Sequence, residues 1–354
     1  MAFGGPALIE DLPFDTWDPA IDAGDRVSAI ESLERGKILR LSRLGFEVRP
    51  EERRFLAGEW MDGSSKNIYL RGAERRLRGA RGSPDDLAGL RGLLERFAQH
   101  AQQLVCALFP AYRAALQAGN TSFRPRETAG RPASWRQDDT RLHTDAFPSN
   151  PTGGARILRV FTNVDPGSSP RVWQVGEPFP DMAAKFLPRA RRQLPGEAWL
   201  LSTLKLTKRR RTERDHLMRE LHDQVKLDLA YQRQAPKERI EFLPGATWIV
   251  FSDQVLHSVL SGRLALERDL TASGRELPRS GDRAAQGARA AHRANPGIGV
   301  RAAGARFSRA SCGSAGARPS RRPAGTRRSA TAPARSRRPR CPSGGCRARS
   351  AGSA

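Results

Sequence analysis

Cysteine is scarce in most of this chain. Of the four cysteines among 354 residues, only Cys106 precedes residue 312. A single thiol cannot form an internal disulfide, which excludes a disulfide-stapled secreted domain for this part of the chain. A reducing cytoplasm is therefore the expected compartment.

Long apolar runs are also missing. No stretch reaches about 18 consecutive apolar residues, the length that a transmembrane helix needs. The opening MAFGGPALIEDLP has neither the basic start nor the apolar run of a signal peptide. The sequence thus predicts a cytoplasmic protein without a transmembrane segment.

Acidic residues and lysine almost disappear near the C-terminus. The whole chain has 61 basic and 37 acidic residues, a net charge of +24. From Arg268 onward there are 20 arginines, no lysine and 3 acids, so this part carries +17 and the first 267 residues only +7. In residues 301–354, 48 of 54 positions are Arg, Ala, Gly, Pro or Ser. Residues 269–354 are expected to form a disordered basic tail, because they have too little apolar surface to offset the entropy lost on ordering.

Three interpretations of this tail stay open. It is a basic arm for nucleic acid or anionic lipid, a solvated linker, or the out-of-frame translation of a GC-rich gene. The last fits the GC-rich codons of its five commonest residues and the abrupt change after SGRLALE. Cys341 and Cys346 have no second pair or histidine at zinc-like spacing, so we predict no zinc site.

The first part of the chain has helical periodicity. Residues 25–48 have the pattern of a helix that leads into a strand. Residues 85–117 place apolar side chains at helical spacing after the cap-like Ser83. This pattern predicts a largely helical part over about residues 1–130.

From about residue 135 the pattern becomes β-rich. Strand-like runs are separated by Pro, Gly, Ser and Asn turns: RILRVFTNV, RVWQVGEPF and TWIVFSDQVLHSVLSGRLALE. A helix over residues 212–232 interrupts them, with apolar residues repeating every four positions. We therefore expect a β core over about residues 131–268, which together with the helical part makes one domain of residues 1–268.

The stretch RLHTDAFPS, residues 141–149, suggests a metal site. Side chains alternate along a strand, so His143 and Asp145 would share one face and could reach the same ion. His257, in a strand-rich hairpin, is the candidate third ligand. Two neutral imidazoles and one carboxylate bind Fe(II) and leave positions for a bidentate 2-oxo acid and dioxygen. The alternative is an ordinary loop pair and a hydrogen-bonded core histidine.

The remaining helical histidines are left out of this site. His216 and His222 are six residues apart, a separation that does not align two ligands on one helix face. His100 lies in the apolar pattern of residues 85–117, where a packing or surface role is more common than a ligand role.

Several long motifs, in order, resemble the Kdo 3-hydroxylase family. They are SKNIYLR, LHTDAFPSNPTGGARILRVFTNVDPGSSPRVWQVGEPF, TERDHLMRELHDQVKLDLAYQ and WIVFSDQVLHSVLSG, and the resemblance covers about residues 25–267. Members of this family are Fe(II)- and 2-oxoglutarate-dependent dioxygenases that act on the Kdo sugar of lipopolysaccharide. The resemblance implies an α+β fold with a double-stranded β-helix (jelly-roll, cupin-like) core, flanking helices, and a metal triad of His143, Asp145 and His257.

The resemblance also implies the reaction and its setting. The expected reaction is hydroxylation at C3 of Kdo within Kdo-lipid A, with Fe(II) as cofactor and 2-oxoglutarate and O2 as cosubstrates. The protein would then lie in the cytoplasm or peripherally on the inner face of the inner membrane, with no specific nucleic-acid partner. Two alternatives remain: an iron oxygenase for another substrate, and an inert barrel whose basic tail binds nucleic acid or anionic membrane.

The far carboxylate of 2-oxoglutarate needs a cation, and several arginines are candidates. Position alone points to Arg268 or Arg263, about ten residues beyond the distal histidine. The preferred candidate is Arg159, because Ile157, Arg159, Phe161 and Asn163 share one strand face and an arginine inside a barrel needs an anion. Asn163 is expected nearby. The alternative is that Arg159 points to solvent.

Substrate contacts are expected from two places. Arg171 could pair with the sugar carboxylate and Trp173 could cover the apolar face of the sugar ring. A basic cluster suited to phosphates or carboxylates follows in KLTKRRRTER: Lys205, Lys208, Arg209, Arg210, Arg211 and Arg214.

Overall fold

The structure, a computed structural model, describes residues 8–71, 76–131 and 133–273. Apart from its first five positions, the predicted tail of residues 269–354 therefore lies outside the described residues. Among the described helices, none is both long enough and apolar enough to cross a membrane.

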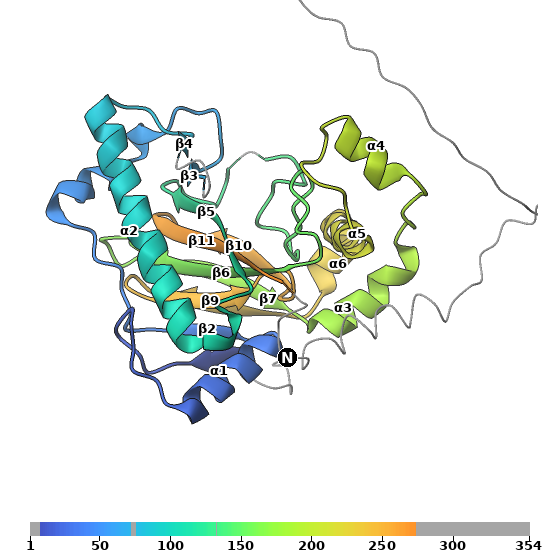
Figure 1. The fold of residues 1–354 in the computed structure, drawn as a ribbon, viewed down its shortest axis with the longest axis horizontal. Coiled ribbons are helices and arrows are strands. Elements are labelled where there is room, and N and C mark those ends of the chain that lie inside the picture. The colour runs from blue at the N-terminus through green and yellow to red at the C-terminus, as the bar shows by residue number, and fades with distance from the viewer. Residues whose placement is uncertain (1–7, 72–75, 132, 274–354) are drawn as a thin grey trace, which may run out of the picture. The chain divides into compact units, whose positions relative to one another are not determined.

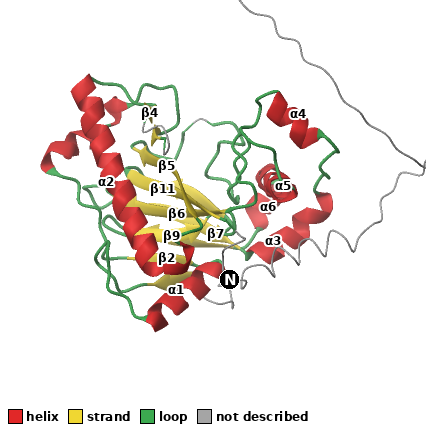
Figure 2. Ribbon diagram, in the orientation of Figure 1, coloured by secondary structure: helices red, strands yellow, loops and turns green. Residues whose placement is uncertain are grey.

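Two β-sheets form the centre of a mixed α+β fold (Figure 2). The large sheet has the order β1-β2-β9-β6-β11-β5-β3-β4 and the small sheet β10-β7-β8, and every neighbouring pair except β1–β2 is antiparallel. The strands are β1 (Ile9–Asp11), β2 (Ile38–Leu41), β3 (Ile68–Leu70), β4 (Leu77–Arg78), β5 (Leu116–Arg124), β6 (Arg156–Asn163), β7 (Arg171–Gly176), β8 (Lys237–Phe242), β9 (Thr247–Phe251), β10 (His257–Ser261) and β11 (Ala265–Ala272).

Strand β6 is buried on both faces, because helices cover one side of the large sheet and the small sheet covers the other. Leu158 and Val160 pack in the cluster that contains α2 (Pro84–Leu108). Phe161, on the opposite face, packs with Trp173 and Trp248 in the cluster between the two sheets. The alternation of side chains along β6 thus places Arg159 and Phe161 in the interior between the sheets.

Helices α1 (Ala23–Glu34) and α2 lie along the large sheet (Figure 1). Helix α2 begins where the sequence predicts, because the Ser83 hydroxyl accepts a hydrogen bond from the Asp86 amide and the Asp86 carboxylate accepts one from the Ser83 amide. The apolar residues that recur at helical spacing are all buried: Leu90, Leu93, Leu94, Phe97, Ala101, Leu104, Val105 and Leu108. The helix ends at Leu108, short of the predicted residue 117, because Pro110 cannot continue it.

A helical excursion separates β7 from β8. It consists of α3 (Phe179–Phe186), a 3-10 turn (Leu187–Arg189), α4 (Glu197–Thr203), α5 (Glu213–Leu227) and α6 (Leu229–Gln234). The other described 3-10 helices are Pro50–Leu56, Gly58–Trp60 and Pro110–Tyr112. The helix predicted over residues 212–232 is two helices, since the Asp228 carboxylate caps α6 at the Tyr231 amide. Leu229 consequently leaves the apolar stripe and is exposed.

Two predicted boundaries differ from the structure. The strand expected at the end of residues 25–48 is β2, but the part of residues 1–130 expected to be largely helical also contains β1, β3, β4 and β5, all in the large sheet. Of these, β1, β3 and β4 have only two or three residues, and β5 alternates too weakly between apolar and polar residues to be recognised. The predicted domain end at residue 268 lies inside β11, which pairs with β5 and β6 as far as Ala272.

Candidate metal centre

His143, Asp145 and His257 lie together although more than a hundred residues separate the first from the last. The backbones of His143 and His257 form an antiparallel bridge with two N–H···O hydrogen bonds of 2.9 Å. The Asp145 amide donates to the Ser252 carbonyl at 2.8 Å, which ties the loop to the end of β9. One ligand atom from each side chain lies within 4.8 Å of the other two.

Both imidazoles are oriented by their Nδ1 atoms. His143 Nδ1 is 2.8 Å from the Arg141 carbonyl oxygen, and His257 Nδ1 is 2.8 Å from that of Val255. A carbonyl can only accept, so Nδ1 carries the hydrogen and the lone pair lies on Nε2. Two Nε2 lone pairs beside a buried carboxylate match the donor set of a facial iron site, so the residues fit the metal.

The charge states suit a divalent cation. Burial lowers the pKa of both His143 and His257 below the ordinary value, so both are neutral near pH 7. For Asp145 burial acts to raise the pKa, but the Arg159 guanidinium outweighs it and the pKa lies below its usual range. The site therefore presents two neutral nitrogen ligands and one carboxylate.

Trp173 does not lie where its ring could cover the face of a sugar. Its side chain is 1% exposed, and its ring stacks on the His257 ring with a centroid distance of 4.9 Å and an interplanar angle of 20°. Phe161 and Phe242 meet it edge-on. Trp173 therefore fixes the orientation of His257, and the expected contact with the sugar ring does not fit this position.

Arg159 faces the interior, as its strand face predicts, but it already has anionic partners. Its guanidinium lies 3.1 Å from Asp145, 2.8 Å from Glu267 and 3.1 Å from Asp269. The carboxylates of Asp145 and Glu267, together with the nearby Asp269 carboxyl group, leave this cation poorly available to a further anion. Arg159 thus holds the Asp145 carboxylate in place.

The other two residues expected near the cosubstrate have structural contacts. The Asn163 amide donates to the Phe242 carbonyl at 3.0 Å and its oxygen accepts from the Asp165 amide at 3.0 Å. Arg268 points to the face of β11 opposite Glu267 and donates to Gly119 and Thr121 on β5, at 3.0 and 2.9 Å. Neither side chain contacts the triad.

Arg171 is a buried cation without an ion-pair partner in the described part of the chain. It shares the interior face of β7 with Trp173, and its only hydrogen bond goes to the Gly262 carbonyl at 3.1 Å. Burial lowers its pKa to about 9. Gly262 has a φ of +113°, and a Cβ there would lie 2.7 Å from the Arg171 Cα, so only glycine allows this approach.

Sequence reasoning missed the polar residues that surround the triad. Lys226 is 1% exposed, donates to the Arg136 carbonyl at 2.8 Å and contributes to the low pKa of His143. His222, four residues earlier on α5, packs its ring 5.7 Å from that of His143. His222 and Lys226 are four residues apart on α5, so both lie on one face of the helix. This spacing in the sequence could have indicated that the two side chains lie close together.

The basic cluster after α4 is partly used for folding. Arg214 pairs with Asp253 at 2.8 Å, and Arg211 donates to the Pro148 carbonyl at 2.6 Å. The other members, Lys205, Lys208, Arg209 and Arg210, are exposed. The cluster thus borders the loop that follows Asp145.

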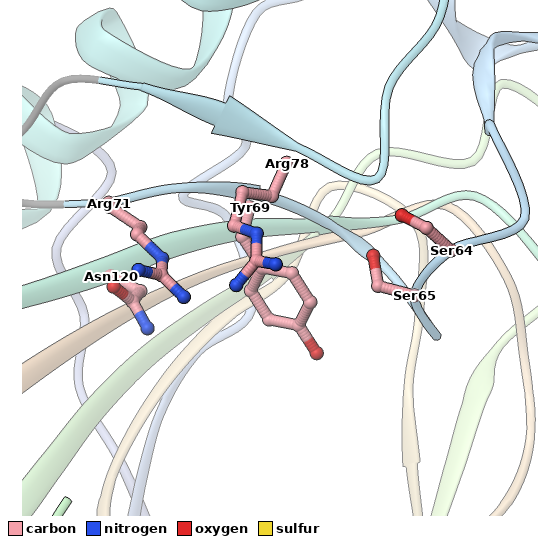
Figure 3. Close-up of a pocket in the computed structure, with 6 residues that line it drawn as sticks. All are labelled: Ser64, Ser65, Tyr69, Arg71, Arg78 and Asn120. Atoms are coloured by element: carbon pink, nitrogen blue, oxygen red, sulfur yellow. The ribbon is translucent and has the colours of Figure 1, made fainter. Parts of the chain in front are cut away.

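A cavity of about 260 Å³ lies at the β3–β4–β5 end of the large sheet. Figure 3 shows the side chains of Arg71 and Arg78 extending to the same side of the strands as the Tyr69 ring. Among the described residues the lining is polar and contains no acidic side chain: Ser64, Ser65, Tyr69, Arg71, Arg78 and Asn120. Such a lining suits an anionic, hydroxyl-rich molecule.

Comparison with known proteins agrees with this geometry. Residues 16–282 match the family model described as 3-deoxy-D-manno-oct-2-ulosonic acid (Kdo) hydroxylase. The chain belongs to the Kdo hydroxylase family. A crystal structure of the Kdo hydroxylase KdoO, described as a non-heme Fe(II) alphaketoglutarate dependent dioxygenase in complex with cobalt(II), is 43% identical with a TM-score of 0.74. The match covers 77% of this chain and 91% of that one.

A second KdoO structure, in complex with alphaketoglutarate and Fe(III), is 42% identical with a TM-score of 0.73 and the same coverage. A search of curated proteins found no match. The mixed α+β architecture seen here is therefore the fold of a Kdo hydroxylase. The family membership that the sequence motifs predicted for the chain is confirmed.

Proposed function

We propose that this Kdo hydroxylase family member is an Fe(II)- and 2-oxoglutarate-dependent dioxygenase that hydroxylates the Kdo sugar. The observation that carries the proposal is the buried group of His143, Asp145 and His257, with both Nε2 atoms free to bind metal. The identity of 43% with KdoO supports the same cofactor and cosubstrate. The two facing sheets would form the double-stranded β-helix core typical of such enzymes.

When bound, the iron supplies the oxidising chemistry that turns a C–H bond of the sugar into C–OH at the expense of 2-oxoglutarate and dioxygen. The chain's part is to hold the reactants in place. His143 and His257 bind through Nε2, Asp145 binds through its carboxylate, and Trp173 keeps the His257 ring in its orientation. The water-poor surroundings favour these charge interactions.

Arg171 is the arginine best suited to the far carboxylate of 2-oxoglutarate. It lies on the same interior face as the Trp173 ring that stacks on His257, and it has no carboxylate partner among the described residues. A buried guanidinium without a counter-ion is unfavourable until an anion arrives. This role replaces the contact with the sugar carboxylate expected for Arg171, and Arg159 keeps its role beside Asp145.

The acidic sugar then needs another site, and the cavity lined by Tyr69, Arg71 and Arg78 suits it. The strand register aligns the cavity with the triad. Tyr69 lies opposite Ser122 on the neighbouring strand, the Ser122 hydroxyl donates to Glu267 at 3.1 Å, and Glu267 forms an ion pair with Arg159 beside Asp145. Kdo and its lipid A phosphates are anionic, so an arginine-rich lining complements them.

The finer assignment is C3 of Kdo within Kdo-lipid A, presented at the inner face of the inner membrane. The test is incubation of the full chain with Kdo-lipid A, Fe(II), 2-oxoglutarate and ¹⁸O₂. One labelled oxygen atom should appear in the Kdo unit by mass spectrometry, and succinate should form in equal amount. Folded, metal-loaded protein that leaves this lipid unchanged but hydroxylates another sugar would refute the substrate and keep only the reaction class.

A further inference from the structure

None of the residues of helix α4 is buried. Five of the nine large apolar side chains that are exposed in the described residues gather in and around it, 50 to 62% exposed. They are Leu194, Trp199, Leu200, Leu204 and Leu206. Figure 1 shows α4 at the outer edge of the α3–α6 group. Exposed apolar side chains clustered in this way usually mark an interaction surface.

Specific contacts hold this apolar surface in place. The Arg191 guanidinium forms a two-point ion pair with Glu197 at 2.7 and 2.9 Å, and Glu197 also accepts from the Leu194 amide at 3.1 Å. His216 Nε2 on α5 is 2.7 Å from the Arg191 carbonyl oxygen. The protein therefore presents the apolar side chains on a braced element of defined geometry.

The charge beside the apolar side chains indicates what covers them. From residue 198 to residue 212 there is no acidic residue and there are five basic ones. Four of these are exposed: Lys205, Lys208, Arg209 and Arg210. Tryptophan and leucine next to lysine and arginine are the side chains that bind the interface of an anionic bilayer. The positive charge and the apolar side chains together match a bilayer that has anionic headgroups above an apolar interior.

The same segment adjoins the metal centre. The Lys208 amide donates to the Ser149 carbonyl at 2.9 Å, and Arg211 donates to Pro148, both in the loop that follows Asp145. We propose that residues 194–210 are a membrane-contact surface. Trp199 and its neighbouring leucines enter the interface of an anionic phospholipid bilayer, and the lysines and arginines bind lipid phosphates. This extends the proposed function, since a lipid-borne sugar would be met at the bilayer.

The experiment uses the full chain and vesicles of phosphatidylcholine with phosphatidylglycerol, some carrying brominated acyl chains. Trp199 is the one exposed tryptophan of the six, all of which are described, so quenching by bromine reports on this surface directly. This matters because arginines after residue 274 also attract anionic vesicles. Trp199→Phe should abolish most of the quenching.

The decisive variant is Leu200→Asp with Leu204→Asp, matched by Leu243→Asp in the β8–β9 turn, where the leucine is 58% exposed. We expect the double variant to lose quenching and at least about tenfold in vesicle affinity, since each leucine contributes roughly a tenfold factor on burial. The control should behave as wild type. Equal quenching in wild type and double variant would overturn the proposal.

Two further outcomes distinguish the membrane surface from self-association and from the proposed function. If the double variant changes only a concentration-dependent self-association, the surface is an interface between copies of the chain and the bilayer proposal fails. Hydroxylation of a water-soluble, delipidated Kdo oligosaccharide should stay within about twofold in the double variant. If wild type hydroxylates neither soluble nor lipid-borne Kdo, the proposed function fails while the vesicle result still decides the membrane surface.

Discussion

Arg171→Met should change stability and cosubstrate binding in opposite directions. In the structure Arg171 is 1% exposed and donates one hydrogen bond, to Gly262, while its Nε has no partner. Methionine has a similar length and fills the space without charge. The variant therefore removes a buried cation that nothing among the described residues neutralises.

The pKa of Arg171 gives the magnitude. Burial lowers it from 12.5 to about 9, which corresponds to about 5 kcal/mol against the charged form. Part of this is offset by the lost hydrogen bond, so we expect the protein without 2-oxoglutarate to gain about 1–3 kcal/mol of stability. Losing charge-assisted hydrogen bonds of about 2 kcal/mol should raise KM for 2-oxoglutarate roughly 10- to 100-fold, with kcat less affected.

Two measurements check this prediction. Urea unfolding of the metal-free protein gives the change in stability, and succinate formation at varied 2-oxoglutarate gives KM. The matched control is Arg263→Met, which removes an exposed arginine paired with Asp165. An unchanged KM in Arg171→Met, or a KM that rises equally in the control, would remove Arg171 from the cosubstrate site.

Three more predictions follow from the interior of the fold. His143→Ala should weaken metal binding at least about 100-fold, whereas His222→Ala, whose ring lies 5.7 Å away, should retain the metal by titration calorimetry; equal losses would refute the triad. Gly262→Ala should lower the melting temperature and raise KM for 2-oxoglutarate, because the added Cβ meets Arg171 at 2.7 Å. Asp269 has its pKa raised to about 7, first by burial and then by Glu267. The folded state therefore binds a proton between about pH 4 and 7 that the unfolded state releases, and stability falls as pH rises through that window. Asp269→Asn should stabilise the protein more at pH 8 than at pH 5, as measured by urea unfolding. Equal effects at both pH values would show that ionisation of Asp269 does not cause the pH dependence.

Local signals in the sequence were sufficient to predict that His143, Asp145 and His257 lie together, and to predict the start and the buried face of α2. H-x-D places two ligands through the alternation of a strand, and a histidine in a second β-rich segment completes the set. In α2, the cap at Ser83 and the apolar spacing set the start and the buried face. These features depend on residues close in sequence, or on residue types that one proposed metal ion would require together.

The roles of the arginines could not be predicted in the same way. Whether Arg159 is free or paired depends on which strand lies beside β6, and the sheet order places β11, with Glu267 and Asp269, directly next to it. Arg171 and Arg159 are indistinguishable by sequence pattern, as both are arginines in β-rich runs. Only the strand order assigns three carboxyl groups to one and none to the other.

Strand β11 carries more of the site than its position at the end of the domain suggests. Its inward side chains, Glu267 and Asp269, hold Arg159 against Asp145, and Glu267 also pairs with Arg124 on β5. Arg268 lies between these two residues in the sequence, and its side chain points to the opposite face of β11, where it donates hydrogen bonds to β5. The composition of the chain changes at this strand, so the Asp145 carboxylate, the proposed metal ligand, is braced by the last residues before the arginine-rich region. A change that displaced β11 would leave His143 and His257 joined by their own backbone bridge but would free Asp145 from its cation. Metal binding should therefore be more sensitive to substitutions in β11 than the fold of β6, β7 and β10.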